Sequence, residues 1–247
     1  MSMNDITSVV EKFCATLLSA GLGGESQYFN RISIQRTNET FLYVANLIYS
    51  NIFICGRNGQ SSSAVHCADQ IVGDFKFING KFAPPAAITS NQIRIYINSH
   101  ESIRQLVAFK VAAALNRMHI PFSLKFYSGS SSRVDATVIY CERMHYSIIA
   151  NCVLGCAGND LNCGTPYFTL ELAKGLALAE SPSSGESYGM VMSQLCAKAF
   201  TSELLSGAPS TVSLINSLNA ALVSHGYSVD HMYRNPGSFF TYNFSPL

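Results

Sequence analysis

The stretch Pro121–Tyr140 constrains the fold most, because its pattern predicts two β-strands joined by a polar loop. Apolar residues occupy every second position on the two strands: Phe122, Leu124 and Phe126, then Val134, Ala136 and Val138. This period means that one face packs and the other is free for a different purpose. The free face is predicted to carry Lys125, Arg133 and Asp135. Two cations beside one carboxylate on a rigid sheet indicate an anion-binding site, and a solvated face with an ordinary ion pair is the alternative.

A second alternating stretch, residues 92–98, places isoleucines on one face and Arg94, Tyr96 and Asn98 on the other. A predicted helix over Ser99–Met118 separates this strand from the hairpin. A strand, a helix and a strand in this order favour two parallel neighbouring strands with a right-handed crossover. The three polar side chains are then expected to share a face with the cations of the hairpin.

Helical spacing of apolar residues predicts most of the other elements. Helices are predicted over residues 6–18, 40–48, 142–158, 168–179, 187–206 and 211–224. The pair Asn79-Gly80 favours the positive φ of a tight turn, so residues 75–82 are predicted to form a short hairpin. Residues 57–68 are predicted to be a polar loop, in which His66 is either a candidate acid or an ordinary exposed histidine.

These elements predict an α+β fold with a mixed, largely antiparallel sheet flanked by several helices, and with helical N- and C-terminal parts. The chain has 247 residues, 48% of them apolar, which suffices for one large core. A single domain is therefore predicted over residues 1–247. Residues 1–90 are expected to be helical and irregular, whereas residues 91–247 hold the sheet and the helices that carry the candidate site.

Composition excludes several classes of function. Only 13% of residues are charged, the net charge is +1, and basic residues form no runs, so no nucleic-acid partner is expected. The apolar runs are too short to span a membrane, and the N-terminus lacks the apolar core of a secretory signal. The eight cysteines are expected to be reduced and mostly buried. No metal is predicted, and a site formed by Cys152, Cys156, Cys163 and His145 is the alternative.

The segment Ser187-Tyr188-Gly189 lies where a long helix is predicted to begin. Free backbone N–H groups and the positive end of the helix dipole suit an anion or a developing oxyanion at such a position. The alternative is that Ser187 serves only as the N-cap of the helix.

Four segments match, in order, the motifs of one protein family: RIYIN (Arg94–Asn98), IPFSLKFY to RVDATVIY (Ile120–Tyr140), PYFTLELAKGLALAESPSSGESYG (Pro166–Gly189) and MYRNPGSF (Met232–Phe239). With them the chain resembles the HopA-type family of type III secretion effectors from plant-pathogenic Pseudomonas, and their relatives in peptide natural-product clusters. The matches cover roughly residues 92–240. The chain departs from the family at Met192, where relatives usually have an arginine, and it contains no tryptophan.

The resemblance implies a phosphothreonine or phosphoserine lyase. Relatives in thioamide and class V lanthipeptide pathways are thought to eliminate phosphate from a peptide that a partner kinase has phosphorylated, which leaves a dehydroamino acid. For an effector, the same chemistry implies phosphorylated host proteins as substrates. The expected location is the cytoplasm or, after type III secretion, a host cell, and no cofactor is required. A non-catalytic module that binds phosphopeptides or host proteins is the alternative.

Elimination of phosphate needs a base at Cα, a donor to the enolate-like oxygen, and cations around the leaving group. Arg94 and Arg133 are predicted to bind the phosphate, because a guanidinium matches two of its oxygens. Lys125 is the candidate base: the two arginines favour its neutral form, whereas a bound phosphate favours the ammonium and a clamping role. The remaining candidates have supporting roles: Asp135 orients a cation, Tyr96 and Asn98 donate to substrate oxygens, and Ser187, Tyr188 and Gly189 contact the anion.

Overall fold

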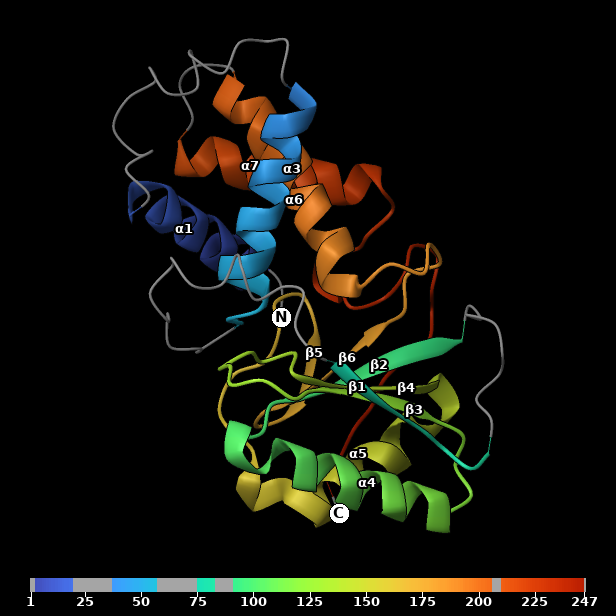
Figure 1. Cartoon of the computed structure of the whole chain (residues 1–247). Helices are drawn as coiled ribbons and strands as arrows, with labels where there is room; N and C mark the ends of the chain where they lie inside the picture. The colour runs from blue at the N-terminus through green and yellow to red at the C-terminus, as the bar shows by residue number, and fades with distance from the viewer. Residues whose placement is uncertain (1–2, 20–36, 57–74, 83–90, 206–209, 247) are drawn as a thin grey trace.

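Within the described part of the chain, one six-stranded sheet lies between two groups of helices (Figure 1). The computed structural model describes residues 3–19, 37–56, 75–82, 91–205 and 210–246. The strand order is β1-β3-β4-β2-β6-β5, and each neighbouring pair is antiparallel. The strands are β1 (Phe75–Asn79), β2 (Gln92–Ile97), β3 (Ser123–Tyr127), β4 (Thr137–Glu142), β5 (Leu170–Ala173) and β6 (Leu176–Glu180). The predicted α+β class is confirmed.

Most of the helices lie where apolar spacing predicts them. The α-helices are α1 (Met3–Ser19), α3 (Thr37–Ile48), α4 (Arg104–Arg117), α5 (Tyr146–Ala157), α6 (Tyr188–Leu205) and α7 (Thr211–Ser224). The shorter elements are the π-helix η2 (Tyr49–Phe53), which continues α3, and the 3-10 turns η4 (Glu101–Ile103), η5 (Arg143–His145), η6 (Gly158–Asp160) and η7 (Val229–His231). The predicted helix over residues 211–224 is confirmed at both ends, and Ser210 caps it by accepting a hydrogen bond from the backbone of Ser213.

One face of the sheet packs on α4 and α5, which lie below it in Figure 1. Aliphatic and aromatic side chains from the central strands have almost no exposed surface on this face: Ile93, Ile95, Ile97, Leu124, Phe126 and Ile139. Burial of each such side chain stabilises the fold by about 1.5–3 kcal/mol. The alternation of strands β2 and β3 therefore predicts this face correctly.

The opposite face of the sheet is also covered. Helices α1, α3, α6 and α7 lie above it in Figure 1, where Phe13 of α1 stacks on Phe200 of α6 with ring centroids 4.4 Å apart. The π-helix η2 and the first turn of α6 lie nearest to the strands, and Tyr49, Ser187 and Gly189 border a pocket there. Polar residues that alternation places on a free face are consequently enclosed between the sheet and these helices.

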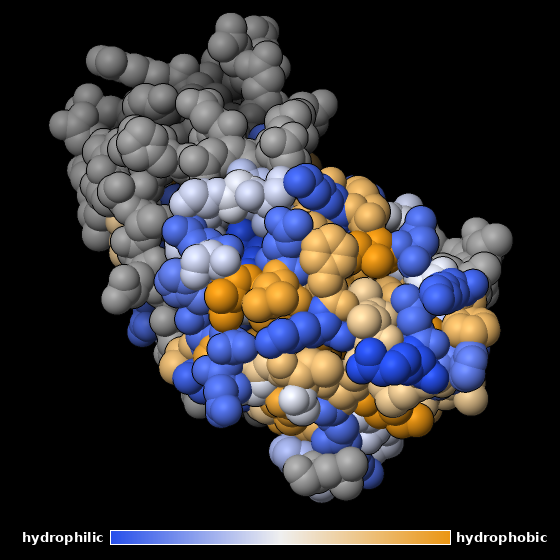
Figure 2. Space-filling view, turned by 60° about the horizontal axis from the view of Figure 1, so that its bottom comes forward, coloured by the Kyte–Doolittle hydropathy of each residue, from blue (hydrophilic) through white to orange (hydrophobic). Residues whose placement is uncertain are grey.

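The outer surface of α4 and α5 is partly apolar. Figure 2 shows hydrophobic side chains gathered on this side of the molecule between charged ones. Large apolar residues with at least 43% exposure include Leu106, Phe109, Met118, Met144 and Ile148. The apolar spacing of α4 predicts Leu106 to be buried, but at 52% exposure it faces outward, because one helix face cannot hold all the apolar positions of this segment.

The prediction of a helix over residues 168–179 is wrong, because this segment forms the hairpin β5–β6. Gly175 makes the turn with φ +66°, and a Cβ there would lie 2.3 Å from the carbonyl oxygen of Asn162. Every residue of β6 is buried, since the strand lies between β2 and β5 and is covered on both faces. A strand buried on both faces shows no alternation, and its apolar run is hard to distinguish from a helix.

The predicted hairpin over residues 75–82 is also wrong. Strand β1 pairs with β3, from Phe75 opposite Tyr127 to Asn79 opposite Ser123, and Lys81 and Phe82 form a bend instead of a second strand. The backbone N–H of Gly80 donates to the carbonyl oxygen of Phe122 at 3.0 Å, so the chain continues along β3 instead of turning. The local preference of Asn-Gly for a turn is overridden by pairing with a strand more than 40 residues away.

The two strands flanking α4 run in the same direction but are not neighbours. Strand β4 lies between β2 and β3 and pairs antiparallel with both. The prediction that β2 and β3 are adjacent is therefore wrong, because β4 lies between them, although the two strands are parallel as predicted. The insertion keeps Arg94 and Lys125 on one face, because β4 places Tyr140 opposite Arg94 and Val138 opposite Lys125.

The second strand of the Pro121–Tyr140 hairpin starts later than predicted. Residues 133–136 form a turn, and β4 begins at Thr137. Its side chains also alternate in the opposite sense, since Thr137 is fully buried and Val138 lies beside Lys125 in the pocket. Arg133 and Asp135 thus extend from a turn and not from the strand. The predicted loop at residues 57–68, with His66, lies outside the described residues.

Candidate functional site

A small pocket lies between the polar face of the sheet and the helices above it. We call it the sheet pocket; it is lined by Tyr49, Phe53, Arg94, Tyr96, Lys125, Asp135, Val138, Tyr140, Pro166, Ser187, Tyr188 and Gly189. Its volume is about 20 Å³, which is room for about one water molecule. The structure thus brings together all but two of the residues predicted for the site, from β2, β3, the turn before β4 and the start of α6.

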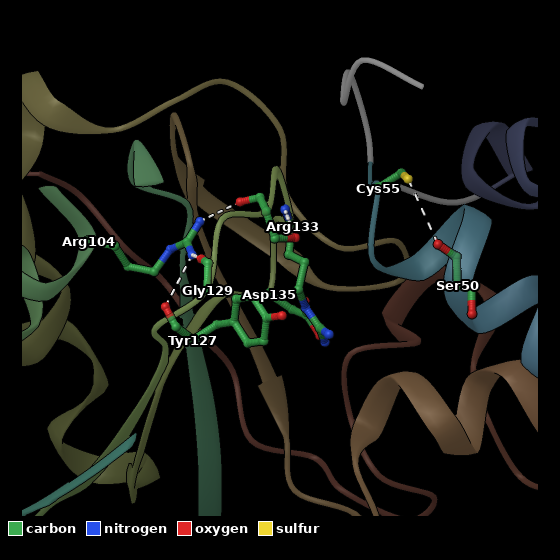
Figure 3. A network of polar contacts seen from close by, with 8 residues as sticks. Ser50, Cys55, Arg104, Tyr127, Gly129, Arg133 and Asp135 are labelled. Atoms are coloured by element: carbon green, nitrogen blue, oxygen red, sulfur yellow. Dashed lines mark hydrogen bonds and ion pairs between the residues drawn. The ribbon is translucent and has the colours of Figure 1, made fainter. Parts of the chain in front are cut away.

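Arg133 and Asp135 form a paired group at the edge of the sheet pocket (Figure 3). The Arg133 guanidinium donates from Nε to Asp135 Oδ1 at 2.9 Å and from Nη2 to Oδ2 at 3.0 Å. It also lies over the rings of Phe75 and Tyr127, at 5.2 and 5.6 Å from their centroids. Burial lowers the pKa of Arg133, but the charge and hydrogen bonds of Asp135 outweigh it and raise the pKa overall. The pair is a fixed, permanently charged element.

Lys125 has a different environment. Its ammonium lies 4.7 Å from the centroid of the Phe75 ring and 5.8 Å from that of Tyr140. With the rest of the described chain it forms no hydrogen bond or ion pair. Two aromatic faces hold the charge by cation–π attraction and leave all three N–H donors unused. Lys125 is consequently the cation of this site that is ready to bind an anion.

Arg94 is buried and hydrogen-bonded to the segment that precedes α6. Its Nε donates to Ser181 Oγ at 3.2 Å and its Nη2 donates to the carbonyl oxygen of Glu186 at 2.5 Å. The guanidinium lies over the Tyr140 ring at 5.4 Å. Neither partner carries a charge in these bonds, so the positive charge of Arg94 remains available to the pocket.

Two tyrosines supply hydroxyl groups to the sheet pocket. Burial raises the pKa of Tyr96, with Arg94 acting in the opposite direction, and burial followed by the charge of Asp135 raises the pKa of Tyr49. The Tyr49 phenol is within hydrogen-bonding reach of Arg133 and Ser187. Both tyrosines are protonated at neutral pH and therefore serve as donors, not as bases.

Asn98 lies apart from the other predicted residues. Its Nδ2 donates to the carbonyl oxygens of Cys163 and Gly164 at 2.8 and 3.0 Å, and the residue lines a separate cavity of about 450 Å³. The strand ends at Ile97, so the alternation that places Asn98 beside Tyr96 stops one residue too early. The amide of Asn98 holds the segment before β5 in place.

At the start of α6, Ser187 both caps the helix and lines the sheet pocket, so the two alternatives for this segment are not exclusive. Ser187 Oγ accepts a hydrogen bond from the backbone N–H of Met190 at 3.1 Å, which makes it an N-cap, and it also lines the sheet pocket. The Tyr188 hydroxyl points away from the pocket and donates to the carbonyl oxygens of Phe168 and Met232. A Cβ on Gly189 would lie 3.0 Å from the Tyr49 ring, so a small residue is needed there.

Met192 does not take part in the site. Its side chain is fully buried in the hydrophobic core and does not border the sheet pocket. The cation expected at this position from related proteins is thus replaced by an apolar packing residue.

Sequence reasoning missed Tyr49, Phe75 and Tyr140. Tyr140 follows Val138 by two residues, so a correct start for β4 would have placed it on the pocket face. Phe75 reaches Lys125 and Arg133 only through the pairing of β1 with β3. Nothing local marks Tyr49, because it enters the site from a π-helix above the sheet.

Arg104 is a further missed residue, and it shapes the loop that carries Arg133. This arginine is 2% exposed, and its guanidinium donates to the carbonyl oxygens of Tyr127, Gly129 and Ser131 (Figure 3). Burial is the main reason that its pKa is lowered. Three carbonyls fixed by one side chain hold the loop between β3 and β4, and with it the position of Arg133.

The described residues contain no group of three or more His, Cys, Asp or Glu side chains placed to hold a metal ion. The alternative zinc site is thus not assembled there: Cys163 is exposed, whereas Cys152 and Cys156 lie together on α5. Within the described helices, none is both long and apolar enough to cross a bilayer.

Comparison with known proteins places the chain in a family. Solved structures share its fold, and two of them are effector proteins. One is an effector protein from Pseudomonas syringae pv. tomato strain DC3000, with a TM-score of 0.53 and 15% identity over 94% of this chain and 99% of the other. The second is an effector protein from P. syringae pv. syringae strain 61, with a TM-score of 0.52 and 14% identity over 95% and 99%. No curated protein sequence matches. The HopA1 effector protein family model matches residues 71–234, and the chain therefore belongs to that family.

Proposed function

We propose that this chain is an effector-type phospho-Ser/Thr lyase, which eliminates phosphate from a phosphorylated peptide or protein and leaves a dehydroamino acid. Family membership supports the effector-like role. One observation carries the enzymatic part: Arg94, Lys125 and the Arg133–Asp135 pair converge on one face from three separate segments. We further propose that a partner kinase makes the substrate and that the protein acts in a host cell after type III delivery.

The reaction removes the Cα proton of the phosphorylated residue, and the electron pair of that bond forms the Cα–Cβ double bond. The Cβ–O bond breaks, and phosphate leaves with its electrons. Cations must therefore stabilise negative charge on the leaving group while a donor stabilises the carbonyl oxygen next to Cα. The sheet pocket provides both kinds of group, since it holds fixed guanidinium charges and protonated phenols.

Each side chain has a role in this proposal. Arg133 binds phosphate oxygens from a position fixed by Asp135, and Arg94 supports it from β2. Tyr96 donates to the developing oxyanion. Lys125 is either the base at Cα or a third phosphate ligand. As an ammonium it has unused N–H donors that suit the ligand role, whereas as a neutral amine it could accept the Cα proton.

The sheet pocket is too small to be a preformed active site. A volume of about 20 Å³ holds one water, whereas a phosphorylated side chain needs several times more. Substrate binding must therefore displace a wall of the pocket. The segment between β6 and α6 is the movable candidate, since residues 183–186 are exposed.

The test is mass spectrometry of phosphothreonine and phosphoserine peptides after incubation with the purified protein. We expect loss of phosphoric acid and formation of the dehydroamino acid. The Lys125→Met and Arg133→Met variants should lower the rate by about 10²–10⁴-fold. Lys110→Met is the matched control, because Lys110 is exposed on α4, on the other side of the sheet. Intact phosphopeptide with every substrate contradicts the proposal.

Met192, an apolar core residue at a position where the family resemblance leads us to expect an arginine, favours a second candidate function, a non-catalytic module that binds phosphopeptides. Isothermal calorimetry separates the two. Binding of a phosphopeptide that is recovered unchanged supports the module, whereas turnover excludes it.

A further inference from the structure

A large groove lies on the other side of the segment that closes the sheet pocket. We call it the side groove, and its volume is about 1010 Å³. Its walls are the segment Ser181–Glu186, helix α6 and the C-terminal segment from Asn235 to Phe240. The volume is at the upper limit of small-molecule sites, which usually span 300–1,000 Å³. A groove of this size between three chain segments suits an extended polypeptide.

The side groove and the sheet pocket share one wall. Ser181 and Glu186, at the two ends of the segment, both line the side groove and both accept hydrogen bonds from Arg94 of the sheet pocket. Residues 183–186 are exposed, and within the described chain their side-chain hydrogen bond to the sheet is the one that Arg94 donates to the Glu186 carbonyl oxygen. A chain lying in the side groove therefore contacts the segment that Arg94 holds from the other side.

The accessible charges of the side groove favour an acidic occupant. Of its two carboxylates, Glu180 is 1% exposed and accepts hydrogen bonds from the Asn235 backbone, Ser238 and Tyr242, at 2.7–2.9 Å. Glu186 is exposed and accepts one from Gln194 at 3.2 Å, so one accessible carboxylate stands against two cations among the lining residues.

The cations of the side groove are not neutralised. Neither Lys198 nor Arg143 forms an ion pair within the described chain. Lys198 is exposed on α6, and Arg143 lies over the Phe240 ring at 4.9 Å. Beside them Phe239 is 90% exposed, and Val191 and Leu195 offer apolar contacts. The surface thus presents two unpaired cations and an apolar floor.

We propose that the side groove binds the polypeptide that flanks the phosphorylated residue of the substrate, and that it selects acidic segments. This inference rests on the proposed function, because it assigns the sheet pocket to the phosphorylated side chain. The groove supplies the binding energy of the flanking chain, and the shared wall separates that chain from Arg94 by one chain segment.

The experiment measures fluorescence anisotropy of labelled phosphothreonine peptides with the full chain. One peptide carries aspartates on both sides of the phosphothreonine, a second carries lysines at the same positions, and a third is the acidic peptide without phosphate. We expect the acidic phosphopeptide to bind at least about tenfold more tightly than the basic one. The unphosphorylated acidic peptide should compete more weakly but should still bind.

Charge reversal locates the interaction. Lys198→Glu should remove most of the preference for the acidic peptide, whereas Lys110→Glu on α4 is the matched control and should preserve it. Both lysines are exposed helical residues, so neither change should affect folding. Equal preference in wild type and Lys198→Glu overturns the proposal.

The two proposals fail in different ways. If acidic peptides bind in a Lys198-dependent manner and no dehydroamino acid forms, the lyase proposal fails and the groove remains. If phosphate is eliminated from acidic and basic peptides alike, by wild type and Lys198→Glu, the lyase proposal remains and the groove is wrong.

Discussion

The two faces of the sheet carry alternate residues of the same strands, yet one face buries apolar side chains and the other buries charged and polar ones. The face toward α4 and α5 is aliphatic and aromatic, with Ile95 and Phe126 almost completely buried. The face toward η2 and α6 is also covered but holds Arg94 and Tyr96, which are buried, and Lys125, which is half-buried. Covering alone therefore does not distinguish a structural face from a candidate site.

The difference is one of cost. Apolar side chains gain free energy on burial, whereas each buried charge loses hydration and needs a partner. Arg133 has the carboxylate of Asp135, and Arg94 has a hydroxyl and a carbonyl. Among the described residues, the partners of Lys125 are two aromatic rings. Stability alone does not explain three cations between the sheet and its helices, because their burial costs free energy. This face therefore indicates a functional site.

The apolar face should show the largest loss of stability. Phe126→Ala removes a ring that is 2% exposed and packs against Phe109, and it should lower the free energy of unfolding by about 3–5 kcal/mol. Urea denaturation followed by circular dichroism measures it. Leu106→Ala on the outer side of α4 is the control and should change stability by less than about 0.5 kcal/mol. Similar losses for both would mean that α4 packs differently.

The charged face should be sensitive to a broken pair. Asp135→Ala leaves the Arg133 side chain, 6% exposed, without its carboxylate and should cost about 3 kcal/mol. The double variant Arg133→Met with Asp135→Leu should recover most of that loss, because no unpaired charge remains. A loss below about 1 kcal/mol for the single change would show that the pair behaves like a surface ion pair.

The buried tyrosines of the charged face should make the free energy of unfolding depend on pH. Burial raises the pKa of Tyr96 above the value of about 10 for an unfolded tyrosine. The unfolded chain then loses its proton first, so stability is complete below pH 10 and declines above it by up to about 1.4 kcal/mol per pH unit. Tyr96→Phe should flatten the decline in alkaline urea titrations. Parallel curves for wild type and variant would contradict this.

Lys125 should show the smallest effect on stability. Lys125→Met keeps the aliphatic stem against Phe75 and removes a charge that has no ionic partner in the described part of the chain, so the free energy of unfolding should change by less than about 0.5 kcal/mol. Phosphopeptide affinity should nevertheless fall at least tenfold by calorimetry. A large loss of stability would assign Lys125 to the fold and not to ligand binding.

Local patterns predict much of this molecule. Alternation places Arg94 and Tyr96 on one face of β2, and Lys125 on one face of β3, before any contact is known. Helical spacing predicts α1, α4, α6 and α7. Both signals arise from the geometry of the nearest neighbours in the chain, which is why the residues themselves suffice to read them.

Other features depend on partners far along the chain. The sequence of the β5–β6 hairpin predicts a helix, because β6 is buried on both faces and shows no alternation. Strand β1 pairs with β3 although its Asn-Gly pair favours a tight turn. Asn98 leaves the site because its strand ends one residue earlier.

By itself, the sequence determined the α+β class, the alternation that sets cations and tyrosines against isoleucines, and the motifs of the effector family. Only the tertiary structure decided that β4 separates β2 from β3, that Tyr49 joins the site from above, and that a side groove adjoins it. The reason is that side-chain direction follows from the local backbone, whereas strand order and the covering of a face follow from contacts between distant residues.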